Sequence, residues 1–171
     1  VLAFRPMKSS LPTCLVDLSR RHAVAWLAVS TLPLAARGAR AAESADVANL
    51  LRAGGCVVML RHAATVAGVG DPPGFRLDAC STQRNLSEAG QQDARRIGEW
   101  FRASGLKPRA VLSSAWCRCK DTADLAFGAH KLWAPLNSTF IERSLQPDQS
   151  RLVRQGMAKV PAGQFEVWVT H

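Results

Sequence analysis

Three short strand-like segments that each run into polar residues constrain this chain more than any other feature. They cover residues 56–60, 110–112 and 165–170, and helix-like segments separate them. The first is a continuous apolar run, which is typical of a strand buried on both faces. Strands that alternate with helices predict an α/β fold with parallel strand pairs. The length of 171 residues suits one domain with a substantial core.

Helix start and stop signals divide the rest of the domain. Ser44 is a candidate N-cap for a short first helix, and Ser87 is the candidate N-cap of a longer amphipathic one. The segment 116–127 predicts a third helix, closed by Gly128, and residues 151–160 predict a fourth.

Two loops are expected between these elements. Residues 63–85 hold several Gly and Pro and show no periodicity, and residues 137–149 form a polar loop. Loops as long as the first are usually functional or disordered. We expect its central part, 67–83, to set specificity, although its side chains indicate no particular ligand.

The net charge of +9 invites a nucleic-acid interpretation, but its distribution argues against one. Of 22 basic and 13 acidic residues, six basic and one acidic lie within residues 1–41. The remaining 16 basic and 12 acidic residues give a net charge of only +4. No lysine run or aromatic and basic stripe accompanies this charge, so we expect no nucleic-acid partner.

The N-terminal segment has the order of a signal peptide. Arg20 and Arg21 precede an apolar stretch over residues 23–36, and Ala39 and Ala41 then supply an A-x-A cleavage site. The paired arginines are similar to those of a twin-arginine signal. An ordinary amphipathic helix is the alternative interpretation.

This interpretation divides the chain into a signal peptide with upstream residues, 1–41, and a domain over residues 42–171. The apolar stretch is short and is interrupted by Pro33, so no stable membrane span is expected. We therefore predict an exported, periplasmic domain. Whether export follows the twin-arginine or the general secretory route stays open.

Four of the five cysteines lie in the exported domain, where disulfides are permitted. Cys56 lies within an apolar strand and is expected to be a buried thiol. We expect Cys80 to pair with Cys117 or Cys119, because all three lie near the same predicted sheet edge. The spacing of Cys117 and Cys119 does not suit zinc.

Polar residues gather where the predicted strands end. The first strand runs into Arg61 and His62, the second precedes Arg118 by one turn of the next helix, and the third precedes His171. In open α/β sheets, ligands bind beyond the carboxyl ends of the strands. We therefore expect two arginines and two histidines to converge at one edge.

This set of side chains suits phosphoryl transfer. Guanidinium groups pair bidentately with phosphate oxygens, and a helix N-terminus adds free N–H groups. A neutral imidazole beside the phosphoryl group is a competent nucleophile, and a second imidazole can stabilise the transferring group. Because arginines supply the positive charge, neither a metal nor another cofactor is expected.

Four ordered motifs resemble the histidine phosphatase superfamily, the phosphoglycerate-mutase-like group. They are LRHAAT, NLSEAGQQDARRIGEW, VLSSAWCRCKDTADLAF and VWVTH, and the resemblance covers residues 49–171. It implies a three-layer α/β/α sandwich with a mostly parallel sheet. One departure is Ala63, which stands where the family usually has glycine.

The resemblance also implies roles for particular residues. His62 matches the nucleophile that accepts the phosphoryl group, and Arg61, Arg118 and His171 match the rest of the phosphate pocket. Thr65 matches a common hydroxyl contact to phosphate.

Two further site residues are assigned from their position in the chain. Arg84, directly before Asn85, is expected at the rim of the pocket. Members of the family often take their general acid from the loop after the arginine-bearing helix. Glu142 and Asp148 lie in that region, and we expect Glu142 to be the acid.

The family continues beyond the position of His171 into another helix and further sheet. We therefore expect the 171-residue chain to be a C-terminally truncated fragment that is poorly active and poorly soluble. A strand at residues 165–170 without its covering helix should expose apolar surface.

Taken together, the motifs predict a metal-independent phosphatase that hydrolyses a small phosphoester, or another phosphorylated substrate, through phospho-His62. A catalytically weak phosphate- or polyanion-binding module of the same fold is one alternative, and a phosphoglycerate-mutase-type phosphotransferase is another. An exported location weighs against the mutase, whose substrates are cytoplasmic. The oligomeric state stays open.

Overall fold

The computed structural model describes residues 45–68 and 70–171. The predicted signal peptide and the candidate N-cap Ser44 lie outside the described residues. The first described element is a helix that extends over residues 45–53.

A parallel sheet forms the centre of the domain. Its strands are β1 (Cys56–Arg61), β2 (Ala110–Ser113), β3 (Lys131–Leu132) and β4 (Phe165–Thr170), in the spatial order β1-β4-β2-β3. Every neighbouring pair is parallel, with Arg61 opposite Thr170 and Ser113 opposite Val169. The carboxyl ends of all four strands therefore lie along one edge.

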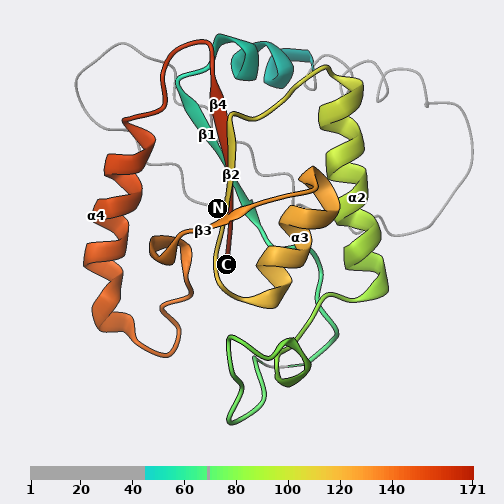
Figure 1. The fold of residues 1–171 in the computed structure, drawn as a ribbon, viewed down its shortest axis with the longest axis vertical. Helices are drawn as coiled ribbons and strands as arrows, with labels where there is room; N and C mark the ends of the chain where they lie inside the picture. The colour runs from blue at the N-terminus through green and yellow to red at the C-terminus, as the bar shows by residue number, and fades with distance from the viewer. Residues whose placement is uncertain (1–44, 69) are drawn as a thin grey trace, which may run out of the picture.

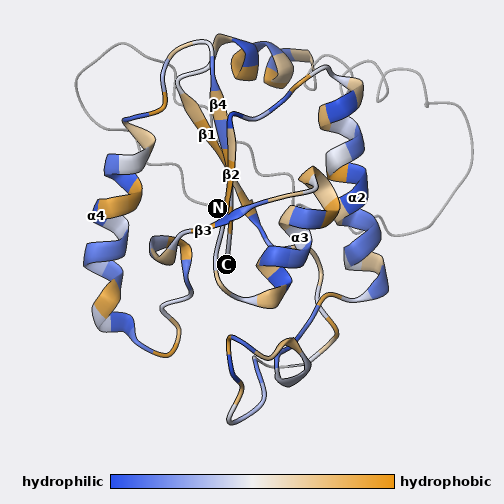
Figure 2. Ribbon diagram, in the orientation of Figure 1, coloured by the Kyte–Doolittle hydropathy of each residue, from blue (hydrophilic) through white to orange (hydrophobic). Residues whose placement is uncertain are grey.

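Helices cover both faces of this sheet (Figure 1). The helix at 45–53, α2 (Glu88–Ala103) and α3 (Cys117–Phe127) pack on one face, where Phe101 stacks on Phe165. The other face carries the 3-10 turn η2 (Ala134–Leu136) and α4 (Gln146–Met157), whose apolar residues surround Trp168. Figure 2 shows the apolar strands between helices with polar outer surfaces. The expected three-layer α/β/α sandwich is confirmed.

Helix α2 begins and packs as its sequence predicts. The Ser87 hydroxyl accepts a hydrogen bond from Gly90 N, which satisfies one of the free amides of the first turn. Gly90 also lies against the backbone of Ala64, and Gly98 lies against the backbone of Ala126 in α3. In both places a Cβ would overlap a main-chain oxygen. The Gly90 contact brings α2 close to the segment that follows His62, and the Gly98 contact brings it close to α3.

The other predicted elements are confirmed with two differences. Helix α3 ends at Gly128, which adopts φ 83° in the left-handed region that glycine favours. Helix α4 starts at Gln146, earlier than predicted, because Pro147 stands at the first turn, where its fixed φ is compatible with a helix. The two-residue strand β3 was not predicted, since it is too short to show a period-2 pattern.

Strand β4 corrects one expectation. Its residues from Phe165 to Val169 are at most 8% exposed, so the apolar surface expected on this strand is not present. Helix α3 packs against one face of β4, and η2 with α4 covers the other. Within the described part of the chain, no helix is both long and apolar enough to cross a membrane.

Candidate active site

Two histidines meet at the carboxyl edge of the sheet. His62 directly follows β1 and His171 directly follows β4, which is the neighbouring strand. Their ring centroids lie 5.6 Å apart, with the planes inclined by 70°. The backbone N–H of His62 donates to Thr170 O at 2.9 Å and extends the strand pairing to the site. The expected convergence of the strand ends therefore occurs.

The imidazole of His62 is held by its own backbone. Nδ1 lies 2.9 Å from the carbonyl oxygen of Ala63, so Nδ1 carries the proton and Nε2 keeps its lone pair. The Ala63 amide donates to Thr122 Oγ1 at 3.0 Å, and Thr122 in turn donates to Arg118 O. This chain of bonds ties the residue after His62 to helix α3.

The imidazole of His171 has a defined tautomer as well. Arg118 Nη2 lies 3.3 Å from Nδ1, and because guanidinium can only donate, Nδ1 is the acceptor. Nε2 therefore carries the proton and donates to Ser114 Oγ at 2.9 Å. The Ser114 hydroxyl then donates to Asn137 Oδ1 at 3.3 Å. The Trp116 ring, with its centroid 5.1 Å from that of His171, packs against its side.

Both imidazoles are neutral over the physiological range. Burial, reinforced by the charges of Arg118 and Arg61, lowers the pKa of His62 to about 4. Burial together with the Arg118 charge lowers the pKa of His171 to about 3. A neutral imidazole has the free lone pair that a nucleophile requires. Cys119 Sγ lies 3.6 Å from His171 Nε2 and is a neutral thiol, because burial raises its pKa to about 12.

Arg118 lies in the first turn of α3 and its side chain is 6% exposed. Nη1 donates to Asp71 Oδ1 at 2.7 Å, and Nη2 faces His171. Nε is buried, with no hydrogen-bond partner among residues 45–68 and 70–171. A buried N–H without a protein partner is the kind of donor that a ligand oxygen can satisfy.

The remaining predicted phosphate ligands lie around this centre. Arg61 is exposed at the end of β1, and its charge acts on both histidines. Arg84 donates from Nη1 to Gly68 O at 3.0 Å, and its charge also acts on His62. Thr65 pairs with Leu86 in an isolated bridge beside the loop.

The predicted general acid lies further out. Glu142 is exposed at the N-cap of the 3-10 turn η3 (Arg143–Leu145), and its carboxylate accepts a hydrogen bond from Ser144 Oγ. Its neighbour Arg143 lines a cavity that also reaches His171. The role of Glu142 stays a prediction.

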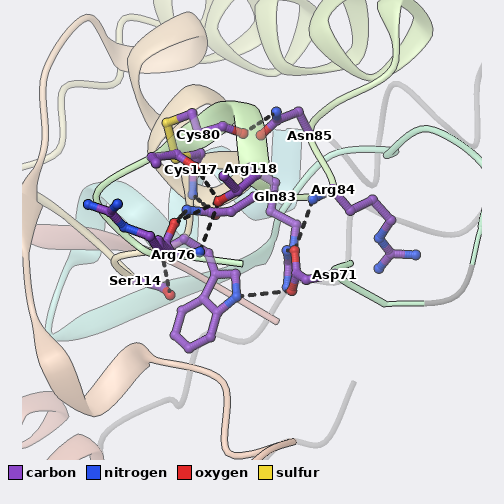
Figure 3. Close-up of a disulfide and its surroundings, with 12 residues drawn as sticks. Asp71, Arg76, Cys80, Gln83, Arg84, Asn85, Ser114, Cys117 and Arg118 are labelled. Carbon is purple, nitrogen blue, oxygen red and sulfur yellow. Dashed lines mark hydrogen bonds and ion pairs between the residues drawn. A yellow bond between two sulfur atoms is a disulfide. The ribbon is translucent and has the colours of Figure 1, made fainter. Parts of the chain in front are cut away.

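The long loop after β1 is fastened to α3. A disulfide joins Cys80 to Cys117, the residue before Arg118, which resolves the two pairings expected for Cys80. Gln83 Oε1 accepts from Cys117 N at 2.9 Å beside it. Figure 3 shows this disulfide together with Asp71, Arg84 and Arg118. The loop thus has an ordered place against the site. Cys56 is buried in β1, as expected.

A cavity of about 580 Å³ opens beside His171 between η2 and α4. Its lining includes Thr170 and His171 at the sheet edge, Phe140 from the segment between η2 and η3, Arg143 of η3, and polar residues of that segment and of α4. These polar residues are Asn137, Ser138, Thr139, Gln146, Gln149 and Ser150. The cavity has the size of a small-molecule site.

Several residues of the site had no role assigned from the sequence. They are Asp71, Ser114, Trp116 and Asn137. Asp71 lies between Gly70 and Pro72 in a segment without periodicity, and only the length of that loop pointed to function. Among the described residues, no group of three or more His, Cys, Asp or Glu side chains could hold a metal ion.

Several solved structures are similar to this chain. SixA from Agrobacterium tumefaciens is 24% identical, with a TM-score of 0.44 and coverage of 70% of each chain. The protein histidine phosphatase SixA complexed with tungstate is 15% identical, with a TM-score of 0.41 and coverage of 67% of this chain and 68% of its own. SixA from Nakamurella multipartitia is 21% identical, with a TM-score of 0.42 and coverage of 67% of this chain and 58% of its own.

No curated protein sequence matches the chain. The family model of the histidine phosphatase superfamily (branch 1) matches residues 57–168. That match spans well over half of the chain and contains His62 and Arg118. The chain therefore belongs to the histidine phosphatase superfamily.

Proposed function

We propose that this protein is a metal-independent phosphatase that hydrolyses a small phosphoester through a phosphohistidine on His62. The observation that carries the proposal is the pair of neutral imidazoles 5.6 Å apart beside the buried guanidinium of Arg118. The fixed tautomer of His62 supports it, because the Nδ1 contact leaves the Nε2 lone pair free for attack.

The reaction runs in two steps with the groups in place. The Nε2 lone pair of His62 attacks phosphorus, the bond from phosphorus to the ester oxygen breaks, and the leaving alcohol takes up one proton. Water then attacks phosphorus and gives up one proton, which replaces the proton that the alcohol took. The bond from Nε2 to phosphorus breaks, so inorganic phosphate leaves and the imidazole returns to its neutral form. Arg118, with the charges of Arg61 and Arg84, stabilises the negative charge that develops on the phosphoryl oxygens.

The cavity beside His171 is the proposed place for the alcohol part of the substrate. Its side-chain amides and hydroxyls suit a leaving group that carries hydrogen-bonding groups, and Arg143 favours an additional negative charge. Glu142, in the same turn as Arg143, is the proposed source of the proton for the leaving oxygen.

We also propose that the domain works after export in an oxidising, periplasmic compartment. The Cys80–Cys117 disulfide supports this, because disulfides persist in such compartments and are rare in the cytosol. The signal segment itself lies outside the described residues.

The decisive experiment traps the covalent intermediate. Protein mixed with a ³²P-labelled phosphoryl donor and quenched in alkali should carry an alkali-stable, acid-labile label, because phosphohistidine has that stability. His62→Ala should abolish the label, and His130→Ala, which alters a half-buried histidine bonded to Asp124, should retain it. Phosphate binding without any label would identify a binding module instead of an enzyme. Transfer of the label to a second alcohol in preference to water would identify a phosphotransferase.

A further inference from the structure

Asp71 is a carboxylate at the site that accepts three hydrogen bonds, although no sequence motif pointed to it. Its side chain is 11% exposed. Oδ1 accepts from Arg118 Nη1 at 2.7 Å and from the backbone N–H of Arg84 at 3.0 Å. Oδ2 accepts from the indole N–H of Trp116 at 3.1 Å. Three donors from separate parts of the site therefore converge on one carboxylate (Figure 3).

These bonds keep Asp71 ionised. Burial raises its pKa, but the hydrogen bonds from Arg118, Arg84 and Trp116 outweigh that effect, so the pKa lies below its ordinary value. An ionised carboxylate has no proton to give. Asp71 is therefore unsuited to protonate the leaving group in the free protein.

The Arg118 nitrogen that Asp71 binds decides which edge of the guanidinium remains for a ligand. A guanidinium offers two edges for bidentate pairing, one made by the two Nη atoms and one made by Nε with Nη2. Asp71 holds only Nη1. On the other edge, Nε is buried and has no partner among the described residues. Nη2 carries two N–H groups, and its contact with His171 Nδ1 uses one of them.

We propose that Asp71 is a positioning residue that fixes the rotation of the Arg118 guanidinium, so that its Nε–Nη2 edge pairs with two oxygens of the substrate phosphoryl group. The inference rests on the proposed function in taking phosphate as the anion of this site. Asp71 acts through Arg118 and does not touch the substrate. The Arg84 amide and the Trp116 indole fix the carboxylate, and the Cys80–Cys117 disulfide fastens its loop.

A competing possibility is that the Asp71 carboxylate opposes phosphate by repulsion or by occupying Arg118. The two possibilities predict opposite changes in phosphate affinity when Asp71 is removed. If Asp71 positions Arg118, removing it weakens phosphate binding. If Asp71 opposes phosphate, removing it tightens binding.

The test is isothermal titration of inorganic phosphate into the native protein, Asp71→Ala, Arg118→Ala and the double variant. Losing the charge-assisted bond should weaken phosphate binding about 10- to 100-fold in Asp71→Ala. The double variant should bind no more weakly than Arg118→Ala, since Asp71 acts only through that side chain. Native or tighter binding by Asp71→Ala, or a loss that persists in the Arg118→Ala background, would overturn the proposal.

A second pair of variants separates positioning from general damage to the fold. In Asp71→Asn the new amide N–H faces the donating indole of Trp116, a clash that Trp116→Phe removes. Asp71→Asn in the Trp116→Phe background should therefore recover most of the affinity of Trp116→Phe alone. Asp71→Ala in that background should not recover it. If Asp71→Asn and Asp71→Ala bind phosphate equally well in the Trp116→Phe background, Asp71 does not position Arg118 through its Oδ1 acceptor. Thermal unfolding reports whether each variant is folded.

The same titrations keep the two proposals apart. If the native protein binds no phosphate, or if Arg118→Ala binds it as well as the native protein does, the proposed phosphate pocket fails and the role of Asp71 fails with it. If Arg118→Ala loses affinity and Asp71→Ala does not, the pocket stands and only the role of Asp71 is wrong.

Discussion

Nη2 of Arg118 lies 3.3 Å from Nδ1 of His171, so the guanidinium that we propose to bind phosphate shares a contact with the second imidazole. This contact makes Nδ1 an acceptor and directs the Nε2 proton toward Ser114. It also helps keep His171 neutral, because the nearby positive charge disfavours a second proton. The orientation of Arg118 and the tautomer of His171 are therefore set together.

The dependence of kcat/KM on pH should reflect histidines with unusually low pKa values. The proposed nucleophile, His62, must be neutral to attack, and its pKa is about 4 in place of the usual 6.5. The acid limb of kcat/KM should therefore lie near pH 4, with activity retained at pH 5.5. Steady-state kinetics from pH 3.5 to 8 measure it. A limb near pH 6.5 that shifts in a His171 variant would contradict the neutral pair.

The same histidines should make folding stability depend on pH. Unfolded histidines bind protons near pH 6.5, whereas His62 and His171 resist protonation until about pH 4 and pH 3. Below pH 6.5 the unfolded chain therefore binds more protons, and the free energy of unfolding falls as the pH falls. Urea denaturation at pH 7, 5.5 and 4.5 should show this decline. His62→Gln should make the decline shallower, and an unchanged slope would speak against the burial described here.

Removing the Cys80–Cys117 disulfide should impair the site as well as the fold. The bond closes a loop across a sequence separation of 37, and its loss should lower the free energy of unfolding by about 2–4 kcal/mol. Because the bond also fastens the loop over residues 63–85, which carries Asp71, to α3, KM should rise and kcat should fall in Cys80→Ala/Cys117→Ala. Dithiothreitol should reproduce both effects in the native protein and leave the double variant unchanged. Native kinetics in the double variant would show that the bond is not needed at the site.

Gly90 and Gly98 are two glycines of α2 in close contact with backbone, and their alanine variants can be compared as a matched pair. Alanine favours helix over glycine by about 1 kcal/mol, but a Cβ at either position would overlap backbone atoms. Both changes should therefore destabilise the protein, by about 1–3 kcal/mol. Gly90→Ala pushes on Ala64, near His62, so it should also lower kcat well below that of Gly98→Ala. If both variants have the same kcat at a temperature where both are folded, the contact between Gly90 and Ala64 does not influence the site as expected.

Glu142 can be tested by varying the leaving group. If its carboxyl protonates the ester oxygen, Glu142→Gln should lower kcat about 100-fold or more for an alkyl phosphate. It should change kcat little for p-nitrophenyl phosphate, whose leaving group needs no proton. Asp148→Asn, which alters an exposed carboxylate on α4, is the control and should behave as native for both. A uniform effect on both substrates would remove Glu142 from the proton transfer.

Chelators should leave the activity unchanged. Arginines surround the two histidines and supply the positive charge that a metal would otherwise provide. The measurement is the rate after dialysis against EDTA, compared with the rate after adding back Zn²⁺ or Mg²⁺. Loss of activity on dialysis and recovery with either ion would contradict the proposed chemistry.

The fold and the centre of the site were predictable because they depend on local patterns. Apolar runs located β1, β2 and β4, and the Ser87 cap and Gly128 stop located α2 and α3. The rule that ligands bind at the carboxyl ends of parallel strands then brought His62 and His171 together. Each of these inferences needs only residues near in sequence and the general geometry of a parallel sheet.

The parts that were missed depend on contacts between distant residues. Asp71 became visible only when the loop placed it on Arg118, 47 residues away in the sequence. The relay from His171 through Ser114 to Asn137 joins three separate elements. The covering of β4 was misjudged because α4, which precedes it in the chain, occupies the face that was expected to be bare.

The position of β4 between β1 and β2 has a consequence for how the molecule folds. The strand order β1-β4-β2-β3 gives β1 no sheet neighbour other than β4 within the described chain. Residues 56–113 can therefore form helices and collapse, but they cannot pair β1 with β2 in the native arrangement. Joining β1 to β4 closes a loop of more than 100 residues, which is an entropically costly and slow step. That step also brings His62 to His171, so sheet closure and assembly of the histidine pair are one folding event.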